Sequence, residues 1–325
     1  MFGRIMGLMA LIILASIAPA SAVGFQWAAA PDAEGEPLKV AIWYPSTASP
    51  QTRQIGPFEM NIALDAPVSG HGRGLIVMSH GTGGSAVNSY DTAMALAEAG
   101  YIVAAVAHTG DNYQDQSASF SSRNFVNRPR HITRVLDYLL HGWIGHDVID
   151  PKKIGFFGHS AGGTTGLIAG GGVADWSKAL AFCTLHPKDW GCRKAAERGL
   201  TSGNDTPTAG GVPDRRIKAM ALATPALIHV FEPNGLKAFT PPVQVWVSGK
   251  DEVVTNAAAV RPLLTHGLSY HLVPDAGHFA FLAPCNEILR GAAPEICADP
   301  RGFDRARFLK RFQRELIAFY RRTVK

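Results

Sequence analysis

Short, continuous runs of apolar residues recur along the chain and constrain its fold more than any other feature. They are Lys39–Tyr44, Gly74–Ser79, Tyr101–Ala107, Ile154–Phe157, Ile217–Leu222, Val243–Val247 and Tyr270–Val273. Stretches with helical spacing of apolar residues, Asn88–Gly100 and Arg130–His141, fall between them. Strands that are apolar throughout are buried on both faces. The pattern predicts an α/β fold with a mostly parallel sheet and helices on both faces. We expect the first strand to end at Pro45, with a loop over Ser46–Thr52.

The segment Lys153–Thr165 contains the motif Gly158-His159-Ser160-Ala161-Gly162 directly after an apolar run. G-x-S-x-G in this context predicts a tight strand-to-helix turn with a strained serine at its centre, and the flanking glycines avoid clashes. The following helix dipole and the Ala161 N–H favour negative charge beside the Ser160 hydroxyl. We therefore predict that Ser160 is a nucleophile. The alternative is an ordinary serine in a glycine-rich turn.

A serine nucleophile needs a base to take its proton and an acid to orient that base. Asp251 follows the run Val243–Val247, and His278 follows the run Tyr270–Val273. The chain order is then serine, aspartate, histidine, with His278 as the predicted base and Asp251 as the predicted acid. Glu252 is the nearest rival for the acid, and Asp251 could instead serve as a turn residue or a helix cap.

Three of the other histidines have positions that call for comparison with His278. His159 lies inside the motif, so we expect its side chain to point away from Ser160. His271 lies within a predicted strand. His108 follows a central strand and could reach the cleft as a substrate contact.

The negative charge that develops on the carbonyl oxygen during such a reaction needs N–H donors. The N–H of Ala161 is one candidate. The run Gly74–Ser79 leads into His80-Gly81-Thr82-Gly83-Gly84, and we predict the Thr82 N–H as the second. A plain glycine turn is the alternative.

One segment, 170–216, interrupts the alternation of strands and helices and is rich in Gly, Asp, Thr and Pro. We interpret it as a cap inserted over the site rather than an independent domain. Its aromatic residues Trp176, Phe182 and Trp190 could form an apolar pocket wall or a core.

The first 22 residues have the pattern of a signal peptide. Arg4 precedes the apolar run Ile5–Ile17, and Ala20-Ser21-Ala22 is a small-residue cleavage site. We predict cleavage after Ala22, export to the periplasm or the medium, and one domain over residues 23–325. The weaker alternative is an anchor retained in the membrane; no later stretch has the length of a membrane span.

The chain has four cysteines: Cys183, Cys192, Cys285 and Cys297. An even number in an exported chain predicts two disulfides. Three pairings are possible, and the local one needs only short loops to close. We expect no metal site, because the cysteines and histidines lack ligand spacing.

The formal charge of +5 comes largely from the last segment, in which Phe308, Phe312, Leu316 and Phe319 form an apolar stripe. The basic residues there are Arg305, Arg307, Lys310, Arg311, Arg314, Arg321, Arg322 and Lys325. This predicts an amphipathic helix with a solvated basic face, rather than a contact with an anionic surface. No pattern of a nucleic-acid module is present.

Taken together, these motifs resemble the α/β-hydrolase superfamily, and most of all its dienelactone hydrolase-like and platelet-activating-factor acetylhydrolase-like esterases. The resemblance depends on SHGTGG at Ser79–Gly84, NRPRHITRVLDYL at Asn127–Leu139, GHSAGG from Gly158, SGKDEVV at Ser248–Val254 and DAGHF at Asp275–Phe279. It implies an α/β-hydrolase fold and an ester hydrolase that uses Ser160, His278 and Asp251, with a small-molecule ester substrate and no cofactor.

Two departures from these relatives narrow the expectation. Dienelactone hydrolases have a cysteine where this chain has Ser160. The acetylhydrolases place the acid after their sixth strand, where this chain has Ala223-Thr224-Pro225 and no carboxylate. The alternatives are a peptidase or amidase on the same fold, and a non-catalytic binding protein. The acyl chain, the alcohol and the oligomeric state stay open.

Overall fold

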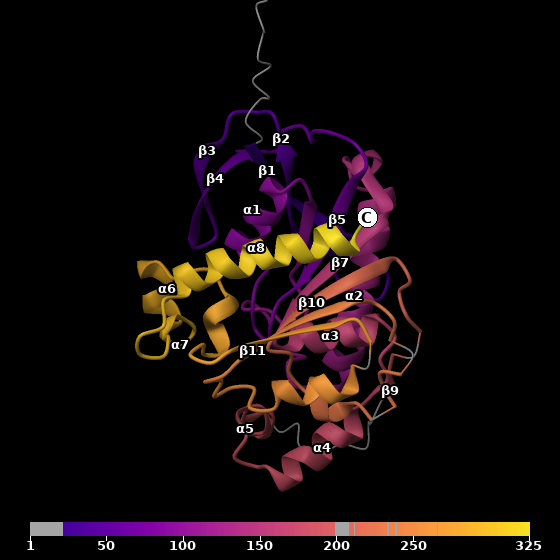
Figure 1. The fold of residues 1–325 in the computed structure, drawn as a ribbon, viewed down its shortest axis with the longest axis vertical. Coiled ribbons are helices and arrows are strands. Elements are labelled where there is room, and N and C mark those ends of the chain that lie inside the picture. Colours follow the sequence, from indigo (N-terminus) through magenta and orange to yellow (C-terminus); the bar gives the residue numbers. More distant parts are fainter. Residues whose placement is uncertain (1–21, 199–207, 211, 233, 238, 265) are drawn as a thin grey trace, which may run out of the picture.

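A computed structural model describes residues 22–198, 208–210, 212–232, 234–237, 239–264 and 266–325 of the chain (Figure 1). The predicted signal peptide, apart from Ala22, lies outside the described residues. Ala22 is the first residue of the first strand and pairs with Ser46.

A ten-stranded sheet is the centre of the structure, in the order β12-β11-β10-β7-β5-β6-β2-β1-β4-β3. Its strands are β1 (Ala22–Ala30), β2 (Leu38–Ser46), β3 (Gln51–Ile55), β4 (Phe58–Leu64), β5 (Arg73–Ser79), β6 (Ile102–Val106), β7 (Ile149–His159), β10 (Ile217–Ala223), β11 (Val243–Ser248) and β12 (Leu268–Val273). The six strands from β6 to β12 are all parallel to one another. The prediction of a mostly parallel sheet from apolar runs is confirmed for this part.

Helices cover both faces of the sheet. They are α1 (Tyr90–Glu98), α2 (Ser122–His141), α3 (Ala161–Ala169), α4 (Trp176–Leu185), α5 (Trp190–Glu197), α6 (Glu287–Ala292), α7 (Pro294–Cys297) and α8 (Arg305–Thr323), with the 3-10 turns η1 (His146–Val148), η2 (Ile228–Val230), η3 (Ala257–Leu263) and η4 (His278–Phe281). Val77 and Phe156 pack with α2 and α3, whereas Met78 and Phe157 pack on the other face with α1 and α8. Successive side chains of a strand point to opposite faces, so a strand between two helical layers must be apolar at every position.

Two predicted boundaries were wrong. Strand β2 continues through Pro45 to Ser46, because proline lacks only the N–H and a strand can continue where the ladder does not need that donor. Helix α2 begins at Ser122, eight residues before the predicted start, and contains Pro129. Strands β1, β3 and β4 were not predicted; they extend the sheet beyond β2, and β3 begins within the expected loop Ser46–Thr52.

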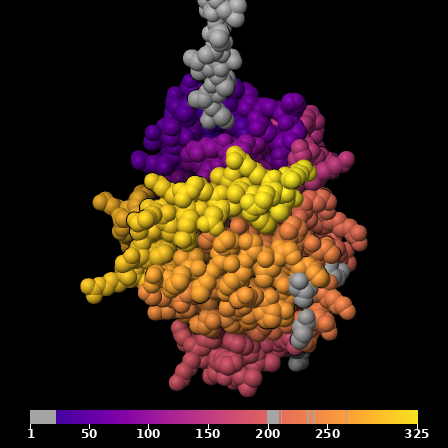
Figure 2. Space-filling view, in the orientation of Figure 1, coloured from indigo at the N-terminus to yellow at the C-terminus, as the bar shows by residue number. Residues whose placement is uncertain are grey.

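Between α3 and β10 the chain forms a separate group of small elements. It contains α4, α5 and a two-stranded sheet of β8 (Ala174–Asp175) and β9 (Thr208–Ala209). Asp175 and Asp189 cap the N-termini of α4 and α5 with their carboxylates. In Figures 1 and 2 this group lies at the end of the molecule opposite β1–β4.

The C-terminal helix α8 is a long amphipathic helix, drawn in yellow in Figure 1. Phe308, Phe312, Leu316 and Phe319 are buried, as the stripe predicted. Arg305 is an exception to the solvated basic face, because it is buried and pairs with Asp299 at 2.9 Å. No helix in the described part of the chain is long and apolar enough to cross a bilayer.

Candidate active site

Ser160 lies between the end of β7 and the first residue of α3. Its φ of 56° and ψ of −120° fall in a region that residues with a side chain rarely adopt. A Cβ atom added at Gly158 would lie 2.2 Å from the Gly162 carbonyl oxygen, and one added at Gly162 would lie 2.0 Å from the Ser79 carbonyl oxygen. The turn therefore requires glycine at both positions and holds Ser160 in a strained conformation.

The structure brings together the three residues predicted from separate strand ends. Ser160 Oγ lies 3.0 Å from His278 Nε2, and His278 Nδ1 lies 2.9 Å from Asp251 Oδ2. His278 is the first residue of η4, after β12, and Asp251 follows β11. The carboxyl ends of β7, β11 and β12 share one edge of the sheet because these strands are parallel. His278 can donate from Nδ1 to the carboxylate while Nε2 accepts from the serine hydroxyl.

Asp251 is held by four donors. Its Oδ1 accepts from the N–H groups of Val253 and Val254 at 2.9 and 2.7 Å. Its Oδ2 accepts from His278 and from the Thr224 hydroxyl at 2.5 Å. Burial would raise the pKa of Asp251, but the hydrogen bonds from His278, Thr224 and the Val254 N–H outweigh it and the pKa is lowered. The carboxylate is therefore ionised and fixed in orientation.

Thr224 is a contributor that sequence reasoning missed. It follows β10 at the strand end where the chain lacks a carboxylate, and its φ of 41° turns the backbone there. Its hydroxyl reaches the carboxylate that projects from the next strand end, Asp251. A hydroxyl residue at that strand end was the only available signal.

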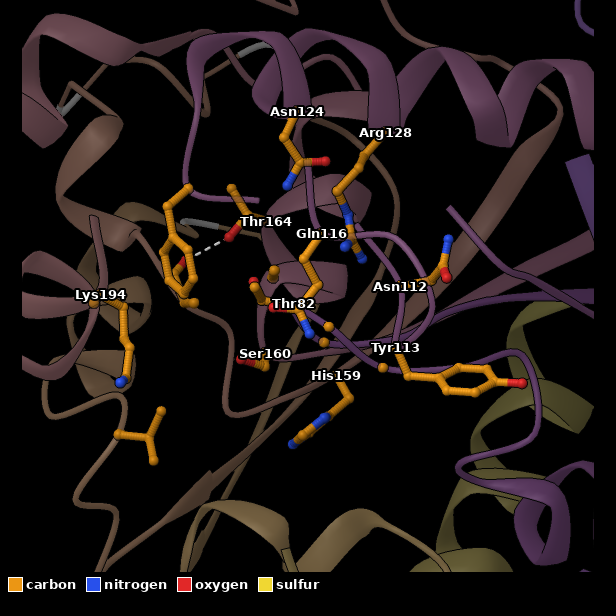
Figure 3. A pocket seen from close by; sticks show the side chains of 18 of the residues that line it. Thr82, Asn112, Tyr113, Gln116, Asn124, Arg128, His159, Ser160, Thr164 and Lys194 are labelled. Atoms are coloured by element: carbon orange, nitrogen blue, oxygen red, sulfur yellow. Dashed lines mark hydrogen bonds between the residues drawn. The ribbon is translucent and has the colours of Figure 1, made fainter. Parts of the chain in front are cut away.

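The two residues predicted to supply N–H donors both lie close to Ser160. Ala161 is the first residue of α3, and Thr82 is in the loop after β5; both line the same cavity as Ser160. A Cβ atom at Gly81 would lie 3.1 Å from Ser160 Cβ, which places this loop directly against the turn. Figure 3 shows Thr82 next to Ser160.

The other three histidines that were compared with His278 do not replace it as the base. His159 Nε2 bonds the carbonyl oxygen of His278 at 3.0 Å and not the serine, and burial lowers the pKa of His159 to about 3. His271 lies in β12, as expected. The expectation that His108 could contact a substrate was wrong: it is fully buried, with its ring nitrogens bonded to Ser79 and His131.

A cavity of about 930 Å³ opens beside Ser160. Trp176, Phe182 and Trp190 all line it, so the aromatic residues of segment 170–216 form part of its wall. The Cys183–Cys192 disulfide joins α4 to α5 along the same wall. The described residues of segment 170–216 thus help to enclose the space beside the serine.

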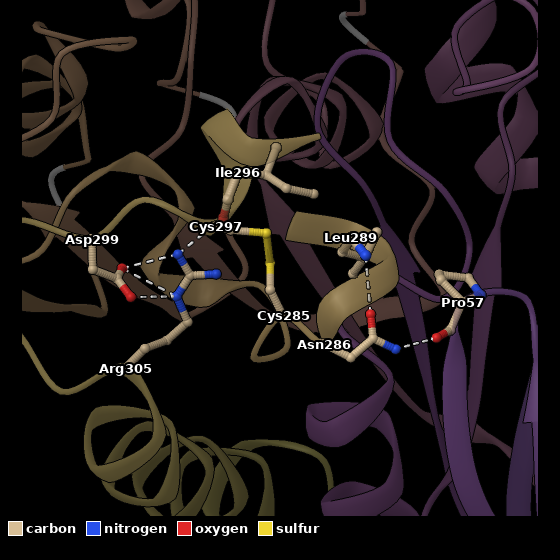
Figure 4. Close-up of a disulfide and its surroundings, with 8 residues drawn as sticks. All are labelled: Pro57, Cys285, Asn286, Leu289, Ile296, Cys297, Asp299 and Arg305. Carbon is tan, nitrogen blue, oxygen red and sulfur yellow. Dashed lines mark hydrogen bonds and ion pairs between the residues drawn. A yellow bond between two sulfur atoms is a disulfide. The ribbon is translucent and has the colours of Figure 1, made fainter. Parts of the chain in front are cut away.

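The Cys285–Cys297 disulfide supports another part of the cavity wall (Figure 4). It closes a short loop that carries α6 and α7, from which Leu289 and Ile296 line the cavity. Asn286 binds the carbonyl oxygen of Pro57 and so ties this loop to the N-terminal strands. Both disulfides have the local pairing.

Elsewhere in the described residues, no group of three or more His, Cys, Asp or Glu side chains could hold a metal ion. The groups that bind one another at the site are the Ser160 hydroxyl, the His278 imidazole and the Asp251 carboxylate. This set suits nucleophilic and acid–base chemistry.

Comparison with solved structures relates this architecture to known proteins. A ferulic acid esterase from Streptomyces cinnamoneus is 19% identical, with a TM-score of 0.64 over 95% of this chain and 92% of that chain. A dienelactone hydrolase from Anabaena variabilis is 15% identical, with a TM-score of 0.52 over 93% and 99%. The chain has the α/β-hydrolase fold.

A third structure with the α/β-hydrolase fold, a puromycin-hydrolyzing peptidase from Mycobacterium tuberculosis, is 15% identical, with a TM-score of 0.55. The match covers 97% of this chain but only 41% of that protein. No protein-family model matches the chain, and no curated protein matches its sequence.

Proposed function

We propose that the protein is an exported serine hydrolase that cleaves carboxylic esters of small molecules. One observation carries the proposal: the continuous hydrogen-bonded path from Asp251 through His278 to Ser160, at the edge of a cavity of about 930 Å³. A strained serine, a base and an oriented acid are the parts that nucleophilic acyl transfer needs.

The geometry supports a two-step reaction. Ser160 Oγ attacks the ester carbonyl while His278 Nε2 takes its proton, and Asp251 stabilises the imidazolium that forms. The Thr82 and Ala161 N–H groups stabilise the oxyanion, and His278 returns the proton to the leaving alcohol. Water, activated by His278, then hydrolyses the acyl-enzyme and restores the serine. Each step uses the chain's own side chains and water.

The solved structures with the same fold support hydrolysis as the reaction class, because they include an esterase, a dienelactone hydrolase and a peptidase. We favour esters over amides because an alcohol leaves without the amine-binding site that peptide cleavage needs. The likeness to a puromycin-hydrolyzing peptidase supports an amidase as the second candidate. Turnover of short acyl esters and of peptide amides, measured side by side, separates the two.

Export and the cap complete the proposal. Two disulfides agree with an oxidising compartment. We propose that a signal peptide covering residues 1–22 is removed, that residues 23–325 form one α/β-hydrolase domain, and that the insertion at about 170–216 is its cap. N-terminal sequencing of the protein from the periplasm or medium should begin at Val23.

Ser160→Ala tests the activity. Turnover of p-nitrophenyl acetate and butyrate should disappear, together with labelling of Ser160 by a fluorophosphonate. Ser177→Ala is the matched control, because Ser177 is exposed on α4 and does not line the cavity; it should keep both. Full activity in Ser160→Ala contradicts the mechanism, and a wild-type protein that is never labelled supports a non-catalytic binding role.

A further inference from the structure

A buried ion pair lies beneath the loop that carries Thr82. Arg128 on α2 and Asp111, in the loop after β6, meet at 2.6 Å, with 3% and 0% of their side chains exposed. The triad does not include either residue. A buried ion pair adds little stability relative to apolar packing, because both charges lose their hydration. Because stability does not account for the pair, its role must be sought in the contacts that hold the neighbouring backbone in place.

Arg128 contacts both structural elements that supply the proposed N–H donors. Its Nη2 donates to the carbonyl oxygen of His80 and, at 3.2 Å, to the Ser79 hydroxyl. Its Nε donates at 3.0 Å to the hydroxyl of Thr165 on α3, and that hydroxyl donates at 2.9 Å to the carbonyl oxygen of Ala161. One guanidinium thus joins the Thr82 loop to the N-terminus of α3.

Asp111 holds the other end of the same loop. Its Oδ1 accepts from the Gly83 N–H at 3.0 Å and from Ser119 at 2.5 Å, and its Oδ2 accepts from Asn124 at 2.6 Å as well as from Arg128. The residue before Gly83 is Thr82, and the residue two before Thr82 is His80. The pair therefore holds the chain on both sides of the Thr82 N–H.

The His80 ring adds a third restraint. Its Nδ1 donates to the Gly81 carbonyl oxygen at 2.6 Å, and its Nε2 accepts from the His108 N–H at 3.2 Å. Burial and the nearby Arg128 charge lower the pKa of His80 to about 4, which keeps the ring neutral and able to accept at Nε2. The loop is thus restrained through its carbonyl, amide and side-chain groups.

We propose that Arg128 and Asp111 are positioning residues for ester hydrolysis, which together hold the Thr82 and Ala161 N–H groups at the spacing that the oxyanion requires. The inference rests on the proposed function. Oxyanion donors act only within a narrow range of distance, so a small displacement of either donor reduces the stabilisation of the transition state. Four of the five N–H groups of Arg128 donate to protein acceptors, which leaves one for a direct contact with substrate.

Arg128→Lys tests the proposal. Lysine keeps the charge beside Asp111 but is a single donor centre, which cannot reach His80 and Thr165 together. We expect kcat for p-nitrophenyl butyrate to fall about 100-fold, as for loss of one oxyanion donor, with KM within about threefold. Affinity for a trifluoromethyl ketone, whose adduct with serine carries the oxyanion, should fall in parallel.

Arg216→Lys is the matched control, because Arg216 is likewise an ion-paired arginine, bound to Asp214 and Asp137, but does not line the cavity. It should leave kcat and ketone affinity unchanged. Thr165→Val removes the hydroxyl that joins Arg128 to the Ala161 carbonyl oxygen, and it should lower kcat about tenfold in a folded protein. This variant tests the proposal if Arg128→Lys does not fold.

The outcomes separate the two proposals. An active wild type whose Thr165→Val and folded Arg128→Lys variants keep kcat within about threefold overturns the positioning role alone. A lower kcat in Arg128→Lys with unchanged ketone affinity also overturns it. A wild type without ester turnover overturns the proposed function, and this inference with it.

Discussion

Asp251→Asn probes the proposed triad with the smallest change in shape. The amide oxygen can still accept from the Val253 and Val254 N–H groups, so the loop after β11 should keep its conformation. The amide NH2 replaces Oδ2 and faces His278 Nδ1, 2.9 Å away in the native protein. Two donors then oppose each other, and His278 should move its proton to Nε2.

A proton on Nε2 prevents His278 from accepting the Ser160 proton. In the serine-protease triad the same substitution lowers kcat by about 10⁴ through the wrong tautomer. At about 1.4 kcal/mol per tenfold change in rate, this is a loss of about 5 kcal/mol of transition-state stabilisation. Thr224 and the two backbone N–H groups are donors, so none of them supplies the negative charge that His278 loses in Asp251→Asn. We therefore expect a loss of this order here.

The assay is steady-state hydrolysis of p-nitrophenyl butyrate at pH 8, with melting temperature as the check on folding. Glu252→Gln is the matched control, because Glu252 is the adjacent carboxylate and is exposed. It should keep wild-type kcat. If Asp251→Asn keeps more than about one-tenth of kcat, or if Glu252→Gln loses as much as Asp251→Asn, the acid is misassigned.

Three further predictions concern the turn, the cap and stability. Gly162→Ala should abolish turnover, because its Cβ would lie 2.0 Å from the Ser79 carbonyl oxygen and the turn must shift; wild-type kcat in this variant would contradict the geometry. Replacing Cys183 and Cys192 together by serine should destabilise the α4–α5 group by about 2–3 kcal/mol, since the disulfide closes a short loop. Faster proteolysis within α4 or α5 is the expected readout, and unchanged resistance would refute it. Burial raises the pKa of Asp91 to about 6, so ionising it costs the folded state stability as pH rises from about 4 to 6. Asp91→Asn should therefore stabilise the folded protein by about 3 kcal/mol at pH 8, seen as a higher melting temperature, and leave the melting temperature nearly unchanged at pH 3.5.

Strands in the central sheet were predictable because each is buried on both faces, which leaves a continuous apolar run such as Val243–Val247. The outer strands were not. In β3 four of five residues are exposed, so Gln51–Ile55 has no apolar pattern and is a strand only because β4 pairs with it. Helix α2 passes Pro129 although proline cannot donate to the Phe125 carbonyl. Buried contacts of Phe125 and Arg128 offset that loss.

In the site, the sequence was enough to predict the tight turn at Ser160 and the identity of the three residues that meet there. Gly158 is required by a backbone contact only four residues away, whereas the contact that requires Gly162 comes from Ser79 on another strand. The sequence also predicted that Asp251 and His278 would each follow the end of a strand. Arg128 lies four residues before Ile132, on the buried stripe of α2, so its burial could also have been inferred from spacing.

Only the tertiary structure decided which partners these groups have. Thr224 bonds Asp251, Arg128 joins the Thr82 loop to α3, and His108 is enclosed away from the cavity, because strands and helices far apart in the sequence pack there. Hydrogen bonds depend on distances of a few tenths of an ångström. A sequence pattern specifies which face a side chain occupies, whereas the packing of the whole sheet and its helices sets the distances between faces.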